Sequence, residues 1–136
     1  MTAPKIDGGR GDNKLYFIDD ETAEVTLNEL ANKTVTTTIT SSATPTPARA
    51  STRTVLKITA QSEAFELQNP TGTPVEGDML KVEVTDNGTP VAITYDTDYA
   101  DGTVKRPDTT TASTRLMMIF QYSGSEWTCE YAGEDV

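Results

Sequence analysis

Short runs in which polar and apolar residues alternate are the feature that most restricts the fold of this chain. From Thr54 onward six short strand-like runs follow one another, separated by residues typical of turns, and all but the fifth alternate in this way. They are residues 55–59, 65–67, 79–84, 91–95, 115–122 and 126–131. Successive side chains of a strand point to opposite faces, so a period of two residues predicts half-buried strands. Six short strands at this spacing predict an all-β fold, a small antiparallel β-sandwich or barrel of about 80 residues.

Residue usage and turn chemistry agree with this prediction. Threonine accounts for 25 of the 136 residues, and its β-branched side chain favours strands over helices. The strongest turn signal is Asn87-Gly88, because this dipeptide accepts the positive φ angles of a type I′ turn. We therefore expect residues 79–84 and 91–95 to form a hairpin.

The first 53 residues lack this regular pattern. An apolar run at residues 15–18 predicts a short strand, and a second is possible at residues 34–40, where Thr alternates with Val and Ile. Residues 41–53 are rich in Ser, Thr, Ala and Pro, a composition typical of an extended connector. The expected division is an extended N-terminal arm with little regular structure, which attaches the protein and includes the connector, at residues 1–53, and a β-sandwich domain at residues 54–136.

Charge is distributed unevenly along the chain. Residues 1–60 carry seven basic and seven acidic side chains, whereas residues 61–136 carry four basic and fourteen acidic ones. The second part therefore accounts for the whole formal net charge of -10. Such an acidic surface repels phosphate backbones, so we expect no nucleic-acid partner. No apolar stretch approaches the roughly 20 residues of a membrane span, so we expect no membrane partner either.

The chain offers little equipment for catalysis. It contains no histidine and a single cysteine, Cys129, which removes Ser-His-Asp, Cys-His and His-metal sites as well as an internal disulfide. Asp96, Asp98 and Asp101 do not fit an EF-hand loop, whose fifth ligand position would fall on Ala100. A looser calcium site stays open. None of the 21 acidic residues is singled out as a glycosidase pair. We expect no enzyme activity, no cofactor and no catalytic or metal-binding residues.

The run Leu116–Phe120 is apolar at five successive positions, so both faces of that strand are apolar. One face can pack into the sandwich, and the other needs cover. A neighbouring subunit is the simplest cover, and the protein's own N-terminal arm is the alternative. We expect self-association.

The order of turns in the second half of the chain resembles a β-module of phage head-decoration, head-fibre and tail-fibre proteins. The shared order is a strand, the turn Asn69-Pro70-Thr71-Gly72, a strand at residues 79–84, an Asn-Gly turn and a further strand. An apolar strand at residues 116–122, a Gly-containing turn and a strand with Trp127 complete the resemblance, which covers residues 54–132. It implies a non-enzymatic virion protein, often trimeric, that is attached to the particle by its N-terminal part.

The expected function is therefore that of a structural virion protein of a tailed phage, a head-decoration, cement or head-fibre protein on the outer capsid surface. Its expected partners are the major capsid protein and two further copies of itself in a homotrimer. The first alternative is a tail-fibre or receptor-binding tip that binds host surface glycans, and the second is a free carbohydrate-binding or adhesin module. The expected capsid or oligomer contacts are Leu15, Tyr16, Phe17, Ile18, Val35, Ile39, Met117 and Ile119.

Overall fold

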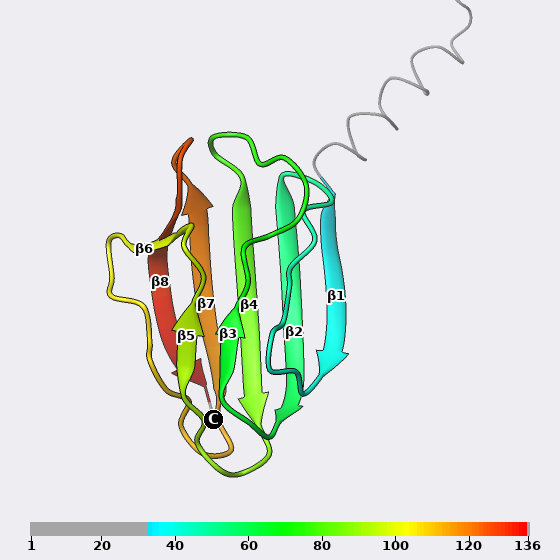
Figure 1. Ribbon diagram of the computed structural model, residues 1–136, viewed down its shortest axis with the longest axis vertical. Helices are drawn as coiled ribbons and strands as arrows, with labels where there is room; N and C mark the ends of the chain where they lie inside the picture. The colour runs from blue at the N-terminus through cyan, green and yellow to red at the C-terminus, as the bar shows by residue number, and fades with distance from the viewer. Residues whose placement is uncertain (1–32, 136) are drawn as a thin grey trace, which may run out of the picture. The chain divides into compact units, whose positions relative to one another are not determined.

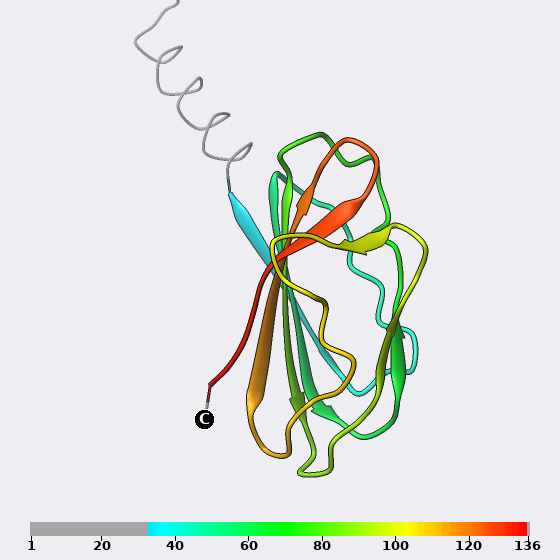
Figure 2. The same cartoon turned by 90° about the vertical axis from the view of Figure 1, so that its left-hand side faces the viewer.

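The computed structural model describes residues 33–135, and this part of the chain is all-β, as the alternation predicts (Figure 1). Its eight strands are β1 (Thr34–Thr40), β2 (Arg53–Gln61), β3 (Phe65–Leu67), β4 (Met79–Asp86), β5 (Ile93–Tyr95), β6 (Tyr99–Asp101), β7 (Arg115–Tyr122) and β8 (Trp127–Asp135). Six strands form one sheet in the order β1-β2-β4-β7-β8-β6, and β3 and β5 form a second, smaller sheet. The small sheet lies over one face of the large one, so the domain is a β-sandwich (Figure 2).

The large sheet is mixed, and the expectation of a wholly antiparallel sandwich is wrong in this respect. β1 pairs in parallel with β2, β2 with β4, and β6 with β8, whereas β4–β7 and β7–β8 are antiparallel. The cause is the path of the chain between strands. After β2 the chain crosses to the small sheet and forms β3 before it returns as β4, so that β4 runs in the same direction as β2 (Figure 1).

The expected hairpin at Asn87-Gly88 is also wrong, although the turn itself is present. β4 pairs with β2 and β7, whereas β5 pairs with β3 in the other sheet. Gly88 has the positive φ that the dipeptide predicts, 105°, and its amide donates to Asp86 Oδ1 at 2.9 Å. The turn therefore carries the chain from one layer of the sandwich to the other.

The core lies between the two sheets and is filled by alternate side chains of each strand. The large sheet contributes one face of β2, β4 and β7, including Val82, Met118 and Phe120, none of which is measurably exposed. The small sheet closes the core with side chains that include Leu67. The expected core positions of Trp127 and Cys129, which are 2% and 0% exposed, are confirmed.

Residues 41–53 are an integral part of the domain rather than a free connector. Pro45 and Pro47 are fully buried, and their carbonyl oxygens accept hydrogen bonds from the amides of Gln68 and Thr71 at 3.0 and 2.9 Å. Proline lacks an amide proton but keeps its carbonyl, so it suits a segment that is hydrogen-bonded along one side only. The segment thus extends the small sheet beside β3.

The compact unit consequently begins earlier than the expected boundary at residues 53/54. Residues 34–136 form one compact unit, separate from residues 1–33. β1 belongs to this unit because all seven of its residues pair in register with β2. A buried ion pair adds to the attachment, in which Arg49 Nε donates to Asp78 Oδ2 at 2.7 Å. Composition misplaced the boundary because hydrogen bonds from neighbouring strands order a segment that has little apolar surface of its own.

Candidate functional site

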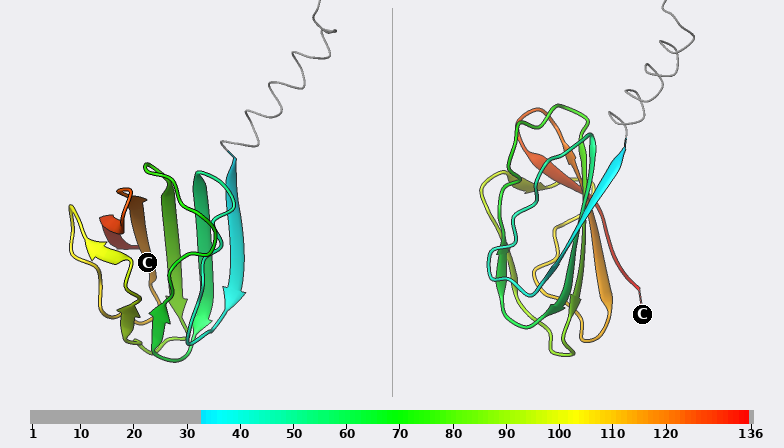
Figure 3. Two further views of the ribbon diagram at one scale, coloured as in Figure 1. Left: turned by 45° about the horizontal axis from the view of Figure 1, so that its top comes forward. Right: turned by 90° about the vertical axis from the view of Figure 1, so that its right-hand side faces the viewer.

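The large sheet has a second face, which points away from β3 and β5 (Figures 2 and 3). We call it the outer face and define it as the outward side chains of β1, β2, β4 and β7. None of residues 33–135 forms a second layer over it (Figure 3). Because sheet faces in sandwiches are normally either packed or strongly polar, its side chains decide whether it is a contact surface.

Several side chains in the middle of the outer face are apolar. Val55, Met117 and Ile119 are half-buried there, and Met79 is 39% exposed. On neighbouring β8, Tyr131 lies opposite Ile119 and is 48% exposed. Apolar side chains from four adjacent strands therefore form a patch that Lys81 of β4 interrupts, because Lys81 lies between Val55 and Ile119.

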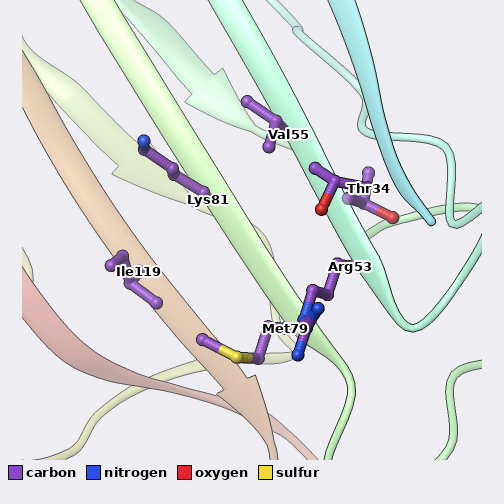
Figure 4. A pocket seen from close by; sticks show the side chains of 7 residues that line it. Thr34, Arg53, Val55, Met79, Lys81 and Ile119 are labelled. Carbon is purple, nitrogen blue, oxygen red and sulfur yellow. The ribbon is translucent and has the colours of Figure 1, made fainter. Parts of the chain in front are cut away.

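A shallow depression of about 290 Å³ lies within this patch (Figure 4). Thr34 of β1 is at one side, next to Val55 of β2, and Ile119 of β7 is at the other side. The labelled residues in Figure 4 are Thr34, Arg53, Val55, Met79, Lys81 and Ile119. Apolar side chains and the two cations Arg53 and Lys81 line the depression together, and Lys81 lies between Val55 and Ile119.

A network of charges lies beside the apolar patch. The carboxylate of Glu83, 5% exposed, is 2.9 Å from Lys81 Nζ, 3.4 Å from Arg115 Nη1 and 3.9 Å from Lys57 Nζ. Arg115 also pairs with Asp135. Burial alone would raise the pKa of Glu83, but the hydrogen bond from Lys81 and the three positive charges outweigh burial and hold this pKa below its ordinary value.

The outer face differs in charge from the rest of the domain. Four of the eight basic residues within 33–135 lie on it, together with one of the fourteen acidic residues, Glu83. The four strands that define the face thus contribute 4 - 1 = +3, whereas the remaining described residues sum to 4 - 13 = -9. Asp135 of neighbouring β8 lies on the same side of the sheet and pairs with Arg115, which lowers the formal charge of this side to +2. The four basic residues are Arg53, Lys57, Lys81 and Arg115. An acidic domain therefore presents one face on which apolar side chains and cations are interleaved.

The buried carboxylates predict a loss of stability in acid. Asp78, Glu83 and Asp86 all have a pKa below the ordinary value, because hydrogen bonds, joined by nearby cations at Asp78 and Glu83, outweigh burial. Their stabilisation is complete above the unfolded-state pKa values of about 4 and is lost as the pH falls through the lower folded-state values. We expect the urea midpoint to be constant from pH 7 to about pH 5 and to fall below about pH 4.

The Glu83→Gln variant should show a weaker acid dependence than the unmodified protein, since it has one fewer such carboxylate. A urea midpoint that rises between pH 5 and pH 3 would contradict the sign of these pKa shifts.

The expected contact residues fall into three groups. Met117 and Ile119 lie on the outer face. Val35 and Ile39 lie on the other side of β1, where Ile39 packs against the core, so they do not share a surface with Met117. The residues of the expected contact run 15–18 lie outside the described residues. Sequence reasoning missed the four cations of the outer face. Arg53 and Lys57 were a signal, because side chains four residues apart on a strand lie on the same face.

The acidic loop that left a calcium site open uses its carboxylates internally. Asp101 Oδ1 accepts from the backbone amide of Arg106 at 3.0 Å and from its guanidinium at 2.9 Å, and Asp96 Oδ1 accepts from the amide of Thr97. Within residues 33–135 no group of three or more His, Cys, Asp or Glu is arranged to hold a metal ion. Cys129 is buried, and burial raises the pKa of its thiol.

Comparison with known proteins assigns no family. Neither a protein-family model nor a curated protein matches the sequence. Within residues 33–135 we find no helix that is long and apolar enough to span a membrane. The functional argument therefore depends on the outer face.

Proposed function

We propose that this is a structural, non-enzymatic virion protein of a tailed phage, which decorates the outer capsid surface as a homotrimer. Its partners are the major capsid protein and its own copies. The observation that carries the proposal is the outer face, a partly apolar sheet face that no described part of the chain covers. The resemblance of residues 54–132 to phage decoration and fibre modules supports the same function.

The composition of the outer face suits a protein contact. Apolar residues around the depression supply area that is unfavourable in water, and a surrounding set of charges selects the partner. Small-molecule sites are normally concave, whereas this depression is a shallow part of a broad sheet face.

Charge supports an outward orientation of the rest of the domain. Outside the outer face, the described residues carry four basic and thirteen acidic side chains. Copies that stand side by side on a particle repel each other least if these acidic surfaces extend into salt solution. Attachment to the capsid is assigned to residues 1–33, since residues 34–53 belong to the β-domain.

The alternative, a tip that binds host glycans, has weaker support. A second depression, of about 360 Å³, lies beside β5 and includes Tyr95 and Arg106. The Arg106 guanidinium lies 5.0 Å from the Tyr95 ring centroid, and Tyr99 and Phe120 pack against the same ring. Tyr95 therefore offers no free aromatic face on which a sugar could stack.

Self-association is tested by measuring the molar mass of the full chain by light scattering at tens of micromolar. We expect a trimer of about 44 kDa, three times the 14.7 kDa of one chain. The double variant Met117→Thr/Ile119→Thr keeps residues that favour strands but removes apolar area from the outer face. It should weaken the trimer at least tenfold in dissociation constant, as expected for about 1.4 kcal/mol or more of lost contact energy.

Val75→Thr is the matched control, because Val75 is 58% exposed but lies outside the large sheet. This variant should leave the trimer intact. The capsid function is tested by sedimenting the full chain with purified capsids of the phage that encodes it. A monomer that does not sediment with the capsids would refute the proposed function.

A further inference from the structure

We infer that β1 is a site of strand pairing between two copies of this protein, in which the β1 strands of both copies lie side by side and antiparallel. β1 is the outermost strand at one margin of the large sheet (Figures 1 and 3). It pairs with β2 on one side, and no strand of residues 33–135 pairs with it on the other. The backbone amides and carbonyls on that second side are therefore a template for a further strand.

The other sheet edges within residues 33–135 are blocked. In the small sheet, the carbonyls of Ala43 and Pro45 accept hydrogen bonds from the amides of β3 and the residue after it, and β5 donates to the carbonyl of Asp108 at 3.0 Å. β6 has only three residues, and the guanidinium of Arg106 donates to its Tyr99 carbonyl at 2.7 Å. The part of β8 that extends past β6, residues 130–135, carries three acidic side chains and a bulge. Charges and bulges of this kind keep edges from pairing.

β1 has none of these devices. It is seven residues long, it pairs with β2 without a bulge, and it contains neither proline nor a charged residue. An edge strand that is long, regular and uncharged is the kind that pairs with another chain. β1 is therefore the one edge of the described domain that is built to accept a partner strand.

The sequence of β1 is complementary to itself in an antiparallel pair. Its residues, Thr-Val-Thr-Thr-Thr-Ile-Thr, have the same order of polar and apolar positions in both directions about Thr37. With Thr37 opposite Thr37 of the second copy, Val35 lies opposite Ile39, and every other pair is Thr with Thr. Thr–Thr pairs stabilise neighbouring strands through their hydroxyl groups. A strand that matches its own reverse needs no second surface, because a twofold axis brings the same surface of both copies together.

The pairing also covers apolar side chains at the margin of the core. Val35 and Ile39 are half-buried, and Ile39 packs against the core. In the antiparallel register about Thr37, paired residues point to the same face of the sheet, so the Val35 and Ile39 side chains of the two copies would cover each other. Both are among the contact residues expected from the sequence. The register gives them a contact of their own, separate from the outer face.

Charge is compatible with two copies that meet at β1. β1 and β5 are the only strands of residues 33–135 without a charged residue, and β5 has neighbours on both sides. In a β1–β1 pair, the β2 strands with their cations are three strand spacings apart, about 14 Å, which exceeds the Debye length of about 8 Å at physiological salt. A twofold pair of outer faces would instead place the four cations of each copy against the same cations of the other.

The contact is small, and its size decides where it forms. Seven residues at about 3.4 Å each give a contact about 24 Å long and one strand wide, well below the roughly 800 Å² per partner of a stable interface. We expect it to be weak in dilute solution and to form where copies are held close together. The pairing itself does not require the trimer. On a particle it would join one trimer to the next, and only this last step rests on the proposed function.

The test is disulfide formation by single variants of the full chain, at a protein concentration well above that of the light-scattering measurement. In Thr37→Cys the two new thiols lie opposite each other, so oxidation with copper phenanthroline should give a covalent dimer. In Thr36→Cys or Thr38→Cys they lie diagonally, about 8 Å apart, beyond the roughly 7 Å that a disulfide can bridge. All three positions are exposed, and the native Cys129 is buried. We expect the Thr37→Cys dimer to form at least ten times faster than the other two.

An equal mixture of the Thr36→Cys and Thr38→Cys proteins tests the register, because residue 36 of one copy lies opposite residue 38 of the other. The mixture should form a disulfide dimer at a rate close to that of Thr37→Cys, although neither protein does so alone. Equal rates for all three single variants would indicate a parallel or unspecific contact. That result, or no dimer from Thr37→Cys and from the mixture, would overturn the inference.

Charges placed at the same two positions give a second measurement of the register. Adding Thr36→Lys and Thr38→Lys to Thr37→Cys brings lysines opposite each other, and cross-linking should slow by about tenfold. The matched pair Thr36→Lys and Thr38→Glu brings lysine opposite glutamate and should not slow it. Urea unfolding checks that both variants are folded. Equal slowing by the two pairs of substitutions would contradict the antiparallel register.

The outer-face variant separates this inference from the proposed function. Met117→Thr/Ile119→Thr, which should weaken the trimer, is combined with Thr37→Cys. We expect the cross-linking rate at residue 37 to be unchanged. An unchanged rate supports the pairing of β1 whether or not the unmodified protein is a trimer. A rate that falls together with the trimer would overturn the inference, because the cross-link would then depend on the outer face.

Discussion

Replacing Phe120 with alanine is expected to lower the free energy of unfolding by about 3–5 kcal/mol, the usual cost of removing a large ring from a packed core. Phe120 is fully buried. Its ring centroid lies 5.0 Å from that of Tyr99 and 6.2 Å from that of Tyr95. The cavity would open between the two sheets, where the surrounding strands cannot close in. Domains of this size are stabilised by only about 5–15 kcal/mol, so the variant should be close to its unfolding midpoint at moderate temperature.

Ile119→Ala is the matched control, because Ile119 is the adjacent residue on the same strand but faces outward. Its substitution should cost about 1 kcal/mol or less, since a half-exposed side chain loses little burial. Urea unfolding at pH 7 measures both variants. Equal effects of the two substitutions would show that the assignment of inner and outer faces on β7 is wrong.

Truncation is expected to give opposite results at two nearby positions. A chain that starts at residue 34 should fold, because residues 34–136 form a compact unit. A chain that starts at residue 54 should not fold stably, since it lacks β1 and the buried Pro45 and Pro47. It also loses Arg49, which leaves the buried carboxylate of Asp78 without its cation and so destabilises the domain further.

Circular dichroism and urea unfolding of the two truncated proteins test this prediction. The longer one should unfold in a cooperative transition, and its free energy of unfolding should lie within about 1 kcal/mol of that of the full chain. The shorter one should show no cooperative transition. A well-folded fragment of residues 54–136 would restore the original boundary at residues 53/54 and contradict the structural role of residues 41–53.

Alternation in the sequence is local information, and it predicted the strands better than their partners. The limits of β7 at Arg115 and Tyr122 agree with the predicted run, because an uninterrupted apolar stretch is bounded by turn residues on both sides. The partner of each strand is decided by contacts far apart in sequence. For this reason Asn87-Gly88 was recognised as a turn but assigned to the wrong pair of strands.

Residues 41–53 show a second limit of composition. Few apolar side chains suggested that a partner surface must order this segment, but backbone hydrogen bonds to β3 and two buried prolines order it within the domain. β6 was missed for a related reason. It has only three residues within a polar loop, too few for a period to be visible.

The outer face was only half predictable. Met117 and Ile119 were found because every residue of their stretch is apolar, which requires cover on both sides of the strand. The cations were not found, since they come from β2, β4 and β7 and gather only through the register of these strands. Lys57, for example, is paired with Glu83 across the parallel β2–β4 ladder. A register of this kind cannot be read from either strand alone.

The parallel pairing of β1 with β2 and of β2 with β4 has a consequence for how the protein comes to fold. Parallel neighbours cannot be joined by a tight turn, so each such pair must close a long loop before it gains any contact. Among the strands of residues 33–135, only β7 and β8 are direct neighbours joined by a short turn. We therefore expect the β7–β8 hairpin to form on the microsecond scale, about 1–10 μs, and the complete sheet to follow far more slowly, as is typical of topologies dominated by distant contacts. During synthesis β1 leaves the ribosome before the other strands of residues 33–135, yet its place in the sheet depends on a β2–β4–β7 framework whose last member is made some 75 residues later, roughly 4–15 s at the usual rate of translation. For that interval the earliest strand of the domain has to remain soluble without its sheet, a demand that its run of threonines is well suited to meet.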